Sequence, residues 1–419
     1  MKTYIIKLIL STFLIIGIHA DKSKDSKDST GWTCESDGFY YQHGKKSEYS
    51  CSGDNKDGSS TSNKDGSSSS NKDKKSEACT ESTNPGMPSS FPKTCINGPP
   101  DQGLRCWWTY IPASVKKLDS SVKVPLVIDM HGGGGCASHQ ALSSGFRELA
   151  DSLSGKDSFI TVWPQGYGYQ WGTCGSDCAA AQAKEASSGK TVHSVDDLTF
   201  LASMIAYIVK SDSSDNPSKT RVDPERVYST GFSMGCMMSH RLAMEKSNII
   251  AGFGGHGGTL IEGGNDLAGE KKKYNIKPMP AYMTGGTDDG WFDMAVNAFN
   301  HWATWNECGV VDPTINFNLT ESKGEKGGSQ PIEARLKVQS SCANNANVNR
   351  LEIINGKHVP DQRMAKLSYD FLKSYKRANA YDALGDLPIL QSSGVTSFNV
   401  NMYMTFMVLI IGCFLNLKN

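Results

Sequence analysis

Residues Gly231-Phe232-Ser233-Met234-Gly235 place a serine between two glycines at a strand-to-helix junction. A strand-like run at residues 226–230 precedes them, and a helix-compatible run at residues 236–245 follows. A turn this tight leaves no space for side chains at its flanking positions, which accounts for both glycines. It lifts the Ser233 hydroxyl above the helix N-terminus, where the backbone N–H of Met234 can face a developing oxyanion. The pattern predicts a nucleophile elbow; an ordinary strand-to-helix turn is the alternative.

Strand-like and helix-like stretches alternate between about residues 79 and 380. Val124–Met130 is almost continuously apolar, as expected of a strand buried on both faces of a sheet. Residues 196–209 carry apolar side chains at helical spacing. This alternation predicts one domain over residues 79–380, with a mostly parallel sheet and helices on both faces, which is an α/β-hydrolase fold. Further strands are expected at residues 159–163, 226–230, 249–253, 281–283 and 351–354, and further helices at residues 236–245, 296–305 and 361–375.

Both ends of the chain carry apolar segments. Residues 1–20 combine basic residues, a short apolar core and a terminal small residue, and we expect them to form a signal peptide. Residues 381–419 contain Ser392-Ser393-Gly394, a mostly polar spacer and the apolar run 402–417. This order fits a glycosylphosphatidylinositol attachment signal, and a single membrane-spanning tail is the alternative. The chain is therefore expected at the extracellular cell surface, with membrane contact only through its C-terminal anchor.

Residues 21–78 have the composition of a linker, because Ser, Lys, Asp and Gly dominate them. The unit Asn55-Lys56-Asp57-Gly58-Ser59-Ser60 recurs at residues 63–68. Such a segment buries too little apolar surface to offset its chain entropy. One aromatic island between Cys34 and Cys51 predicts either a small disulfide-closed hairpin or an adhesive part of the linker.

The chain holds 43 basic and 43 acidic residues, and this balance gives no indication of a nucleic-acid partner. Its 12 cysteines suit an oxidising compartment, where the sequon beginning at Asn318 would also be glycosylated. Because Cys413 lies in the terminal apolar run, its removal would leave at least one thiol unpaired within the chain. Cys174 and Cys178 are expected to close a small disulfide loop. No Cys/His spacing indicates zinc, so we expect no metal or other cofactor, and the oligomeric state stays open.

A nucleophilic serine requires a base and an acid that orients the base. On α/β-hydrolase sheets the three follow in the order serine, acid, histidine, each after a strand. His358 lies on a short glycine-containing loop after the expected strand 351–354, and we expect it to be the base. His301 lies within the expected helix 296–305 and is expected to be structural.

The acid is expected among the aspartates that follow the strand 281–283. Asp288 and Asp289 are adjacent, and Asp293 is near them. One would hold the imidazole tautomer of the base, while another would cap the helix that begins near Trp291.

A second oxyanion donor is expected from the glycine-rich loop at residues 131–135, which directly follows the strand Val124–Met130. Glycines let this backbone approach a reacting carbonyl without an intervening Cβ. We expect the N–H groups of Gly133 and Met234 to form the oxyanion hole, and His131 to be a structural member of the loop. A flexible turn is the alternative, and a phosphate loop is disfavoured because no Gly-Lys-Ser/Thr follows.

These motifs together resemble carbohydrate esterase family one, the feruloyl-esterase, acetylxylan-esterase and polyhydroxybutyrate-depolymerase group of α/β-hydrolases. In that family the acid follows a His-Gly-Thr-x-Asp pattern, which falls on Asp289, although Gly285 stands where the family has histidine. The resemblance also implies a disulfide between Cys308 and Cys342. It covers about residues 95–375 and rests on the 131–135 loop, Trp163-Pro164-Gln165-Gly166, the Val195-Asp196-Asp197-Leu198-Thr199 motif, Asp223-Pro224-Glu225-Arg226-Val227-Tyr228, the elbow, Gly286-Thr287-Asp288-Asp289 and the Gly356-Lys357-His358 loop.

The resemblance implies a secreted serine esterase that hydrolyses feruloyl or acetyl esters on plant or other polysaccharides through an acyl-enzyme. A polyhydroxybutyrate-type polyester depolymerase would use the same machinery and is the first alternative. A catalytically inactive hydrolase-fold adhesion protein of the cell surface is the second, although adhesion has no need of the full set of residues. Five aromatic residues are expected either to line a cleft or to pack around the sheet rim: Trp163, Tyr167, Tyr169, Trp171 and Trp291.

Overall fold

The computed structural model describes residues 86–99, 102–173, 196–212, 214–218, 221–261, 266–319 and 332–385, with the backbone of three short strands between residues 33 and 50. The expected signal peptide, most of the linker, the Cys174/Cys178 loop and the C-terminal anchor lie outside these residues. None of the helices that the structure describes is long and apolar enough to cross a membrane.

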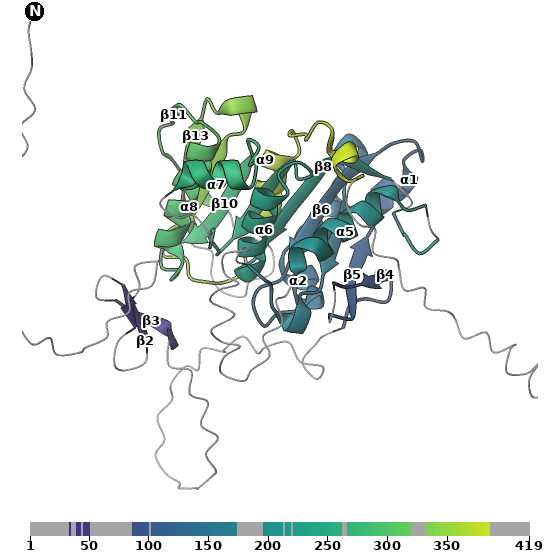
Figure 1. Ribbon diagram of the computed structural model, residues 1–419, viewed down its shortest axis with the longest axis horizontal. Helices are drawn as coiled ribbons and strands as arrows, with labels where there is room; N and C mark the ends of the chain where they lie inside the picture. Colours follow the sequence, from purple (N-terminus) through teal and green to yellow (C-terminus); the bar gives the residue numbers. More distant parts are fainter. Residues whose placement is uncertain are drawn as a thin grey trace, which may run out of the picture. The chain divides into compact units, whose positions relative to one another are not determined.

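The chain divides into two units, Met1–Ser70 and Asn71–Asn419. In the first unit the backbone forms an antiparallel sheet in the order β1-β2-β3, drawn in purple in Figure 1. Its strands are β1 (Thr33–Cys34), β2 (Phe39–Gln42) and β3 (Lys45–Ser50), so strands do form in the aromatic island.

The second unit is built on an 11-stranded sheet with the order β11-β13-β14-β10-β9-β8-β6-β7-β5-β4, in which β12 also pairs with β13. The strands from β7 to β14 along this order are parallel to one another, while β5 runs antiparallel to β7. This order and the reversed strand near one edge are those of the α/β-hydrolase fold. The strands are β4 (Lys93–Asn97), β5 (Leu104–Tyr110), β6 (Val124–Met130), β7 (Ile160–Pro164), β8 (Val222–Gly231), β9 (Gly252–His256), β10 (Ala281–Gly286), β11 (Val310–Val311), β12 (Ile315–Leu319), β13 (Ile332–Ser340) and β14 (Val348–Ile353).

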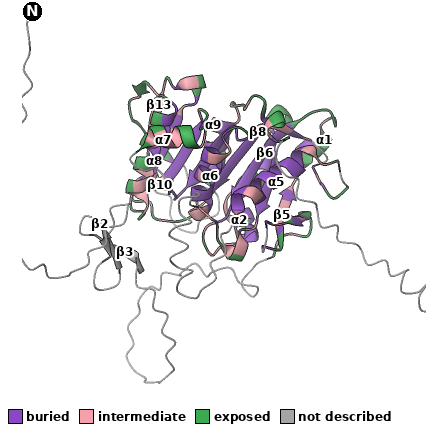
Figure 2. Cartoon of the chain, viewed as in Figure 1, coloured by how far each residue is buried: buried purple, intermediate pink, exposed green. Residues whose placement is uncertain are grey.

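Helices cover both faces of this sheet (Figure 1), and successive side chains of β6 show why. Leu126, Ile128 and Met130 belong to a buried cluster that also holds residues of α5, α6 and α8, whereas Val127 belongs to a second cluster with residues of α2, α3 and α9. A strand buried on both faces needs apolar residues at nearly every position. Figure 2 shows the resulting buried sheet between the helical layers. The helices are α1 (Ala113–Lys117), α2 (Ala137–Ser143), α3 (Phe146–Ser152), α5 (Asp197–Lys210), α6 (Met234–Glu245), α7 (Leu267–Lys273), α8 (Phe292–Trp305), α9 (Arg363–Leu372) and α10 (Ala380–Ala383).

The expected strand at residues 249–253 is misplaced, because the strand β9 begins only at Gly252. Ile249 and Ile250 are buried in the turn before it. The strand itself is glycine-rich because α6 lies close against it: a Cβ on Gly255 would be 2.3 Å from the sulfur of Cys236. Steric demand here outweighs strand propensity.

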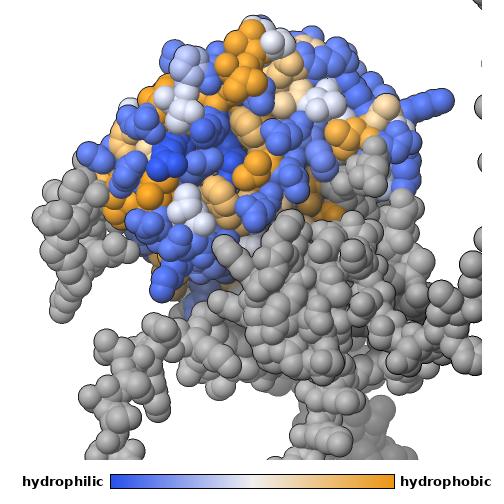
Figure 3. Space-filling model, turned by 90° about the vertical axis from the view of Figure 1, so that its left-hand side faces the viewer, coloured by the Kyte–Doolittle hydropathy of each residue, from blue (hydrophilic) through white to orange (hydrophobic). Residues whose placement is uncertain are grey.

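On the side drawn in Figure 3, hydrophilic side chains predominate among the coloured residues, with apolar ones between them. Several of the exposed apolar residues lie on the short strands β11 and β12, among them Val310, Val311 and Ile315. The antiparallel strands around β13 and the β4–β5 hairpin were not expected from the sequence.

Candidate active site

The elbow connects β8 to α6 with Ser233 at its apex. Ser233 adopts φ 54° and ψ −119°, a strained conformation for a residue with a side chain. A Cβ on Gly235 would lie 2.0 Å from the backbone oxygen of Met130, and one on Gly231 would lie 2.5 Å from the carbonyl carbon of Gly235. Both glycines are therefore required by close backbone approach, and the turn holds the serine hydroxyl clear of the sheet.

Ser233, His358 and Asp289 meet at the carboxyl ends of β8, β10 and β14. Nε2 of His358 lies 2.9 Å from Oγ of Ser233, and its Nδ1 lies 2.8 Å from Oδ2 of Asp289. A carboxylate only accepts hydrogen bonds, so Nδ1 carries the proton and Nε2 is left to accept from the serine. The Asp289 side chain is 3% exposed, whereas that of His358 is 30% exposed and reachable from solvent.

Asp289, and not Asp288, is the aspartate that contacts the imidazole. The expectation that a second aspartate caps α8 is wrong, because the N-cap residue of this helix is Trp291 and it has no side-chain cap hydrogen bond. Oδ1 of Asp289 accepts the backbone N–H of Trp291, at 2.9 Å, where α8 begins. Asp288 is exposed, and its backbone N–H donates to Gly356. The second contact fixes the carboxylate plane, which leaves Oδ2 aimed at His358.

The loop at residues 131–135 lies against the elbow. A Cβ on Gly133 would be 2.5 Å from the sulfur of Met234, so the two expected donor residues are neighbours. Gly134 donates its N–H to Tyr169 and Gly135 donates to Gly132. Among the described residues, the N–H groups of Gly133 and Met234 have no hydrogen-bond acceptor. These two donors remain available to a ligand atom beside Ser233.

His131 is a buried member of this loop. Its Nε2 accepts the N–H of Gly166 and the side-chain N–H of Gln165, both at 3.0 Å, while Nδ1 donates to Gly132 at 2.7 Å. Burial lowers the pKa of His131 to about 4, so the ring is neutral at physiological pH. Both ring nitrogens are therefore engaged in holding the loop.

His256, at the end of β9, was not singled out from the sequence. Its Nε2 donates to the backbone oxygen of Val359 at 2.7 Å, and its Nδ1 accepts from the hydroxyl of Thr284 at 2.6 Å. Its own backbone oxygen accepts the N–H of Ser233 at 2.9 Å. Burial lowers the pKa of His256, which favours this neutral tautomer. His256 therefore links the turn of Ser233 to the loop of His358. In the sequence, only its position in a glycine-rich strand could have pointed to this role.

Of the five aromatic residues expected either to line a cleft or to pack around the sheet rim, two are buried by packing. Trp163 is fully buried and donates its indole N–H to Asp129 at 2.8 Å. Trp171 donates to the backbone oxygen of His131 at 2.8 Å. Tyr167, Tyr169 and Trp291 are partly exposed.

Two disulfides join cysteines that are both among the described residues. Cys308–Cys342 is the pair that the resemblance implied, and Cys95–Cys106 joins directly opposed residues of β4 and β5. Cys136 is also disulfide-bonded. Cys236 is a buried free thiol, and burial raises its pKa. Among the described residues no group of three His, Cys, Asp or Glu side chains could hold a metal ion.

No family model and no curated protein matches this chain. Solved structures resemble it at low identity. An acetyl xylan esterase from Aspergillus awamori is 14% identical with a TM-score of 0.44, over 67% of this chain and 99% of that one. An S-formylglutathione hydrolase from Staphylococcus aureus is 8% identical with a TM-score of 0.42, over 68% and 98%. A ferulic acid esterase is 13% identical with a TM-score of 0.41, over 68% and 96%.

Proposed function

We propose that this protein is a carboxylic ester hydrolase in which Ser233 is the nucleophile, His358 the general base and Asp289 the residue that orients the base. One observation supports this most strongly. An unbroken relay of hydrogen bonds runs from Asp289 through His358 to a serine held in a strained elbow. Backbone strain of this kind is retained where the surrounding structure and a function require it.

The reaction follows from the geometry of the relay. Ser233 Oγ attacks the ester carbonyl carbon while Nε2 of His358 takes the serine proton. The negative charge that develops on the carbonyl oxygen is stabilised by the N–H groups of Met234 and Gly133. His358 then returns the proton to the departing alcohol, leaving an acyl-enzyme. A water molecule, activated by the same Nε2, hydrolyses that ester and regenerates Ser233.

The substrates that we propose are feruloyl or acetyl esters on polysaccharides. This rests on the resemblance of the sequence motifs around the site. The partly exposed Tyr167, Tyr169 and Trp291 are the aromatic candidates left to contact a sugar or a feruloyl ring.

We also propose that the protein is secreted and lipid-anchored, because residues 1–20 and 381–419 have the composition of a signal peptide and an attachment signal. Treatment of intact cells with a phosphatidylinositol-specific phospholipase should release the protein. Retention on the cells would instead support a membrane-spanning tail.

Ester hydrolysis tests the activity directly. The full chain should hydrolyse p-nitrophenyl acetate and methyl ferulate, and Ser233→Ala should abolish both reactions. Ser229→Ala is the matched control, since this serine lies on β8 with a buried hydroxyl that has no hydrogen-bond partner among the described residues. Folded protein that hydrolyses neither ester would favour the adhesion alternative. Hydrolysis of polyhydroxybutyrate alone would identify a polyester depolymerase.

A further inference from the structure

A fully buried ion pair lies outside the catalytic relay. Arg105 of β5 donates to Oδ1 of Asp197, at the start of α5, and their side chains are 2% and 0% exposed. The guanidinium group lies over the ring of Phe200, 4.1 Å from its centroid, and donates to Gln102 at 2.7 Å. Taking two charges out of water is costly, and well-packed apolar residues often stabilise a core as well or better. Stability alone is therefore a weak reason for this pair.

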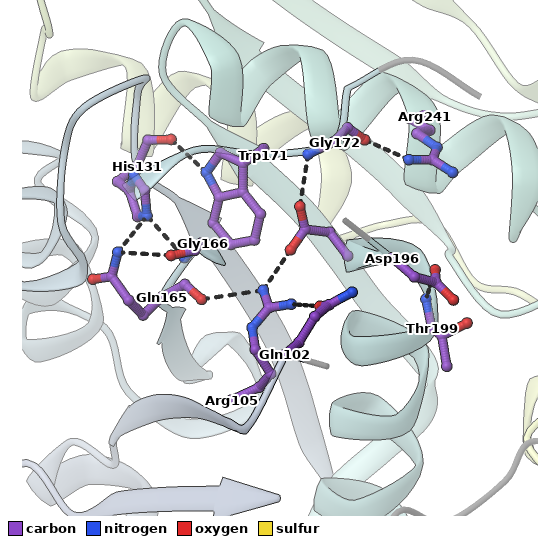
Figure 4. A network of polar contacts seen from close by, with 11 residues as sticks. Gln102, Arg105, His131, Gln165, Gly166, Trp171, Gly172, Asp196, Thr199 and Arg241 are labelled. Atoms are coloured by element: carbon purple, nitrogen blue, oxygen red, sulfur yellow. Dashed lines mark hydrogen bonds and ion pairs between the residues drawn. The ribbon is translucent and has the colours of Figure 1, made fainter. Parts of the chain in front are cut away.

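The ion pair holds both ends of one loop segment, residues 165–172 (Figure 4). Arg105 donates to the backbone oxygen of Gln165 at 3.3 Å, where the segment leaves β7. Asp197 accepts the backbone N–H of Gly172 on Oδ2, at 2.6 Å, where the segment ends. Arg241 of α6 donates to the backbone oxygen of the same Gly172. Each carboxylate oxygen of Asp197 thus has its own donor.

The same segment holds the loop that carries Gly133. Gln165 and Gly166 both donate to Nε2 of His131, and Trp171 donates to the His131 backbone oxygen (Figure 4). Tyr169 accepts the N–H of Gly134 at 2.8 Å. Contacts from residues 165–171 therefore lie on both sides of Gly133 along the chain, so they restrain the backbone that carries its N–H.

We propose that Arg105 and Asp197 are positioning residues of the oxyanion hole, acting through the 165–172 segment; the inference rests on the proposed function of Ser233. The adjacent Asp196 has a different role, because its carboxylate caps α5 by accepting the N–H of Thr199 at 3.0 Å. A donor that only the transition state uses should affect turnover more than substrate binding.

Asp197→Asn is the first test, because asparagine offers one acceptor where the carboxylate offers two. With p-nitrophenyl acetate we expect kcat to fall about 10- to 100-fold while KM stays within about threefold. Inhibition by a trifluoromethyl ketone, which Ser233 converts into an oxyanion, should weaken by the same factor as kcat. The matched control is Asp223→Asn, which removes the partner of Arg226 at the opposite end of β8 and should leave all three quantities unchanged.

The double variant Arg105→Met/Asp197→Leu separates positioning from stability. It replaces the ion pair by apolar side chains and should keep the wild-type unfolding temperature. If the pair positions the loop, kcat falls in this variant too, because Gln165 and Gly172 lose their partners. A wild-type kcat in a folded double variant would overturn the proposal.

A measurement that does not depend on turnover distinguishes a failure of this inference from a failure of the proposed function. In protein labelled with ¹⁵N-histidine, the Nδ1–H that His131 donates to Gly132 should give a downfield proton resonance. We expect this resonance to broaden or shift in Asp197→Asn and to persist in Asp223→Asn. An unchanged resonance in Asp197→Asn would overturn the proposal, whereas absent ester hydrolysis by the wild type would contradict only the proposed function.

Discussion

Asp289 receives the Nδ1–H of His358 on one carboxylate oxygen, at 2.8 Å, while its other oxygen is occupied by the N–H of Trp291, at 2.9 Å. The carboxylate cannot rotate without losing one of the two contacts. The orientation of the base is therefore tied to the first turn of α8, a helix whose apolar face is buried in the core.

Replacing this carboxylate should disable turnover and leave the fold intact. In Asp289→Asn the amide favours the wrong imidazole tautomer, so we expect kcat to fall by roughly a thousandfold or more. The exposed neighbour provides the control, and Asp288→Asn should retain kcat within about twofold. Steady-state hydrolysis of p-nitrophenyl acetate measures both, and equal losses in the two variants would contradict the assignment of Asp289.

His256 should affect the rate although it does not touch Ser233 Oγ in the relay. His256→Leu removes the donor to Val359, and a lost buried hydrogen bond of about 1–2 kcal/mol corresponds to about a 5- to 30-fold lower kcat. Hydrogen exchange should also become faster in residues 357–361. His256→Gln keeps a donor and should recover part of the rate. Unchanged exchange and unchanged kcat in His256→Leu would show that the link is dispensable.

An added methyl group should destabilise the protein at one glycine near the site and have almost no effect at another. Gly235→Ala places a Cβ 2.0 Å from the backbone oxygen of Met130, which cannot move aside, so we expect a loss of about 3 kcal/mol or more in unfolding free energy. A Cβ on Gly285 meets no atom within 4 Å, and Gly285→Ala should be close to neutral. Thermal unfolding of the two variants checks the contrast. A stable Gly235→Ala protein would show that the elbow is looser than described.

Acid should destabilise the protein through buried neutral histidines. His240 accepts the indole N–H of Trp302 at 2.9 Å, and burial lowers its pKa from 6.5 to about 3. Below pH 6.5 the unfolded chain therefore binds a proton that the folded protein excludes until about pH 3. The free energy of unfolding should fall by up to about 1.4 kcal/mol per pH unit across that window. His131 adds a similar dependence down to about pH 4.

His240→Gln keeps an acceptor for Trp302 and removes the titrating ring. Its unfolding free energy, measured in urea from pH 7 to pH 4, should fall less steeply than that of the wild type. Parallel slopes for the two proteins would mean that His240 is protonated normally in the folded state.

The strands and helices near the site could be predicted because each depends on a local pattern. The apolar run Val124–Met130 is observed as β6, and the helix expected at residues 196–209 is observed as α5 (Asp197–Lys210). The prediction at residues 249–253 was wrong because close contact with α6 requires glycine in that strand, while the two isoleucines fill the core from a turn. The outer antiparallel strands were missed because their side chains are only partly buried.

The sequence by itself determined the elbow and the glycine loop, because each is a pattern of a few adjacent residues. It also determined the order of serine, aspartate and histidine, because each of the three lies in its own short motif after an expected strand. The residues alone left Asp288 and Asp289 open, the resemblance favoured Asp289, and the tertiary structure shows that Asp289 contacts His358. Tertiary structure alone decided that the N–H of Gly133 has no acceptor among the described residues, and that Arg105 meets Asp197 across 92 residues of chain. The physical reason is that hydrogen bonds and ion pairs depend on distances of about 3 Å between segments far apart in sequence. Only the packing of helices on both faces of the sheet sets those distances.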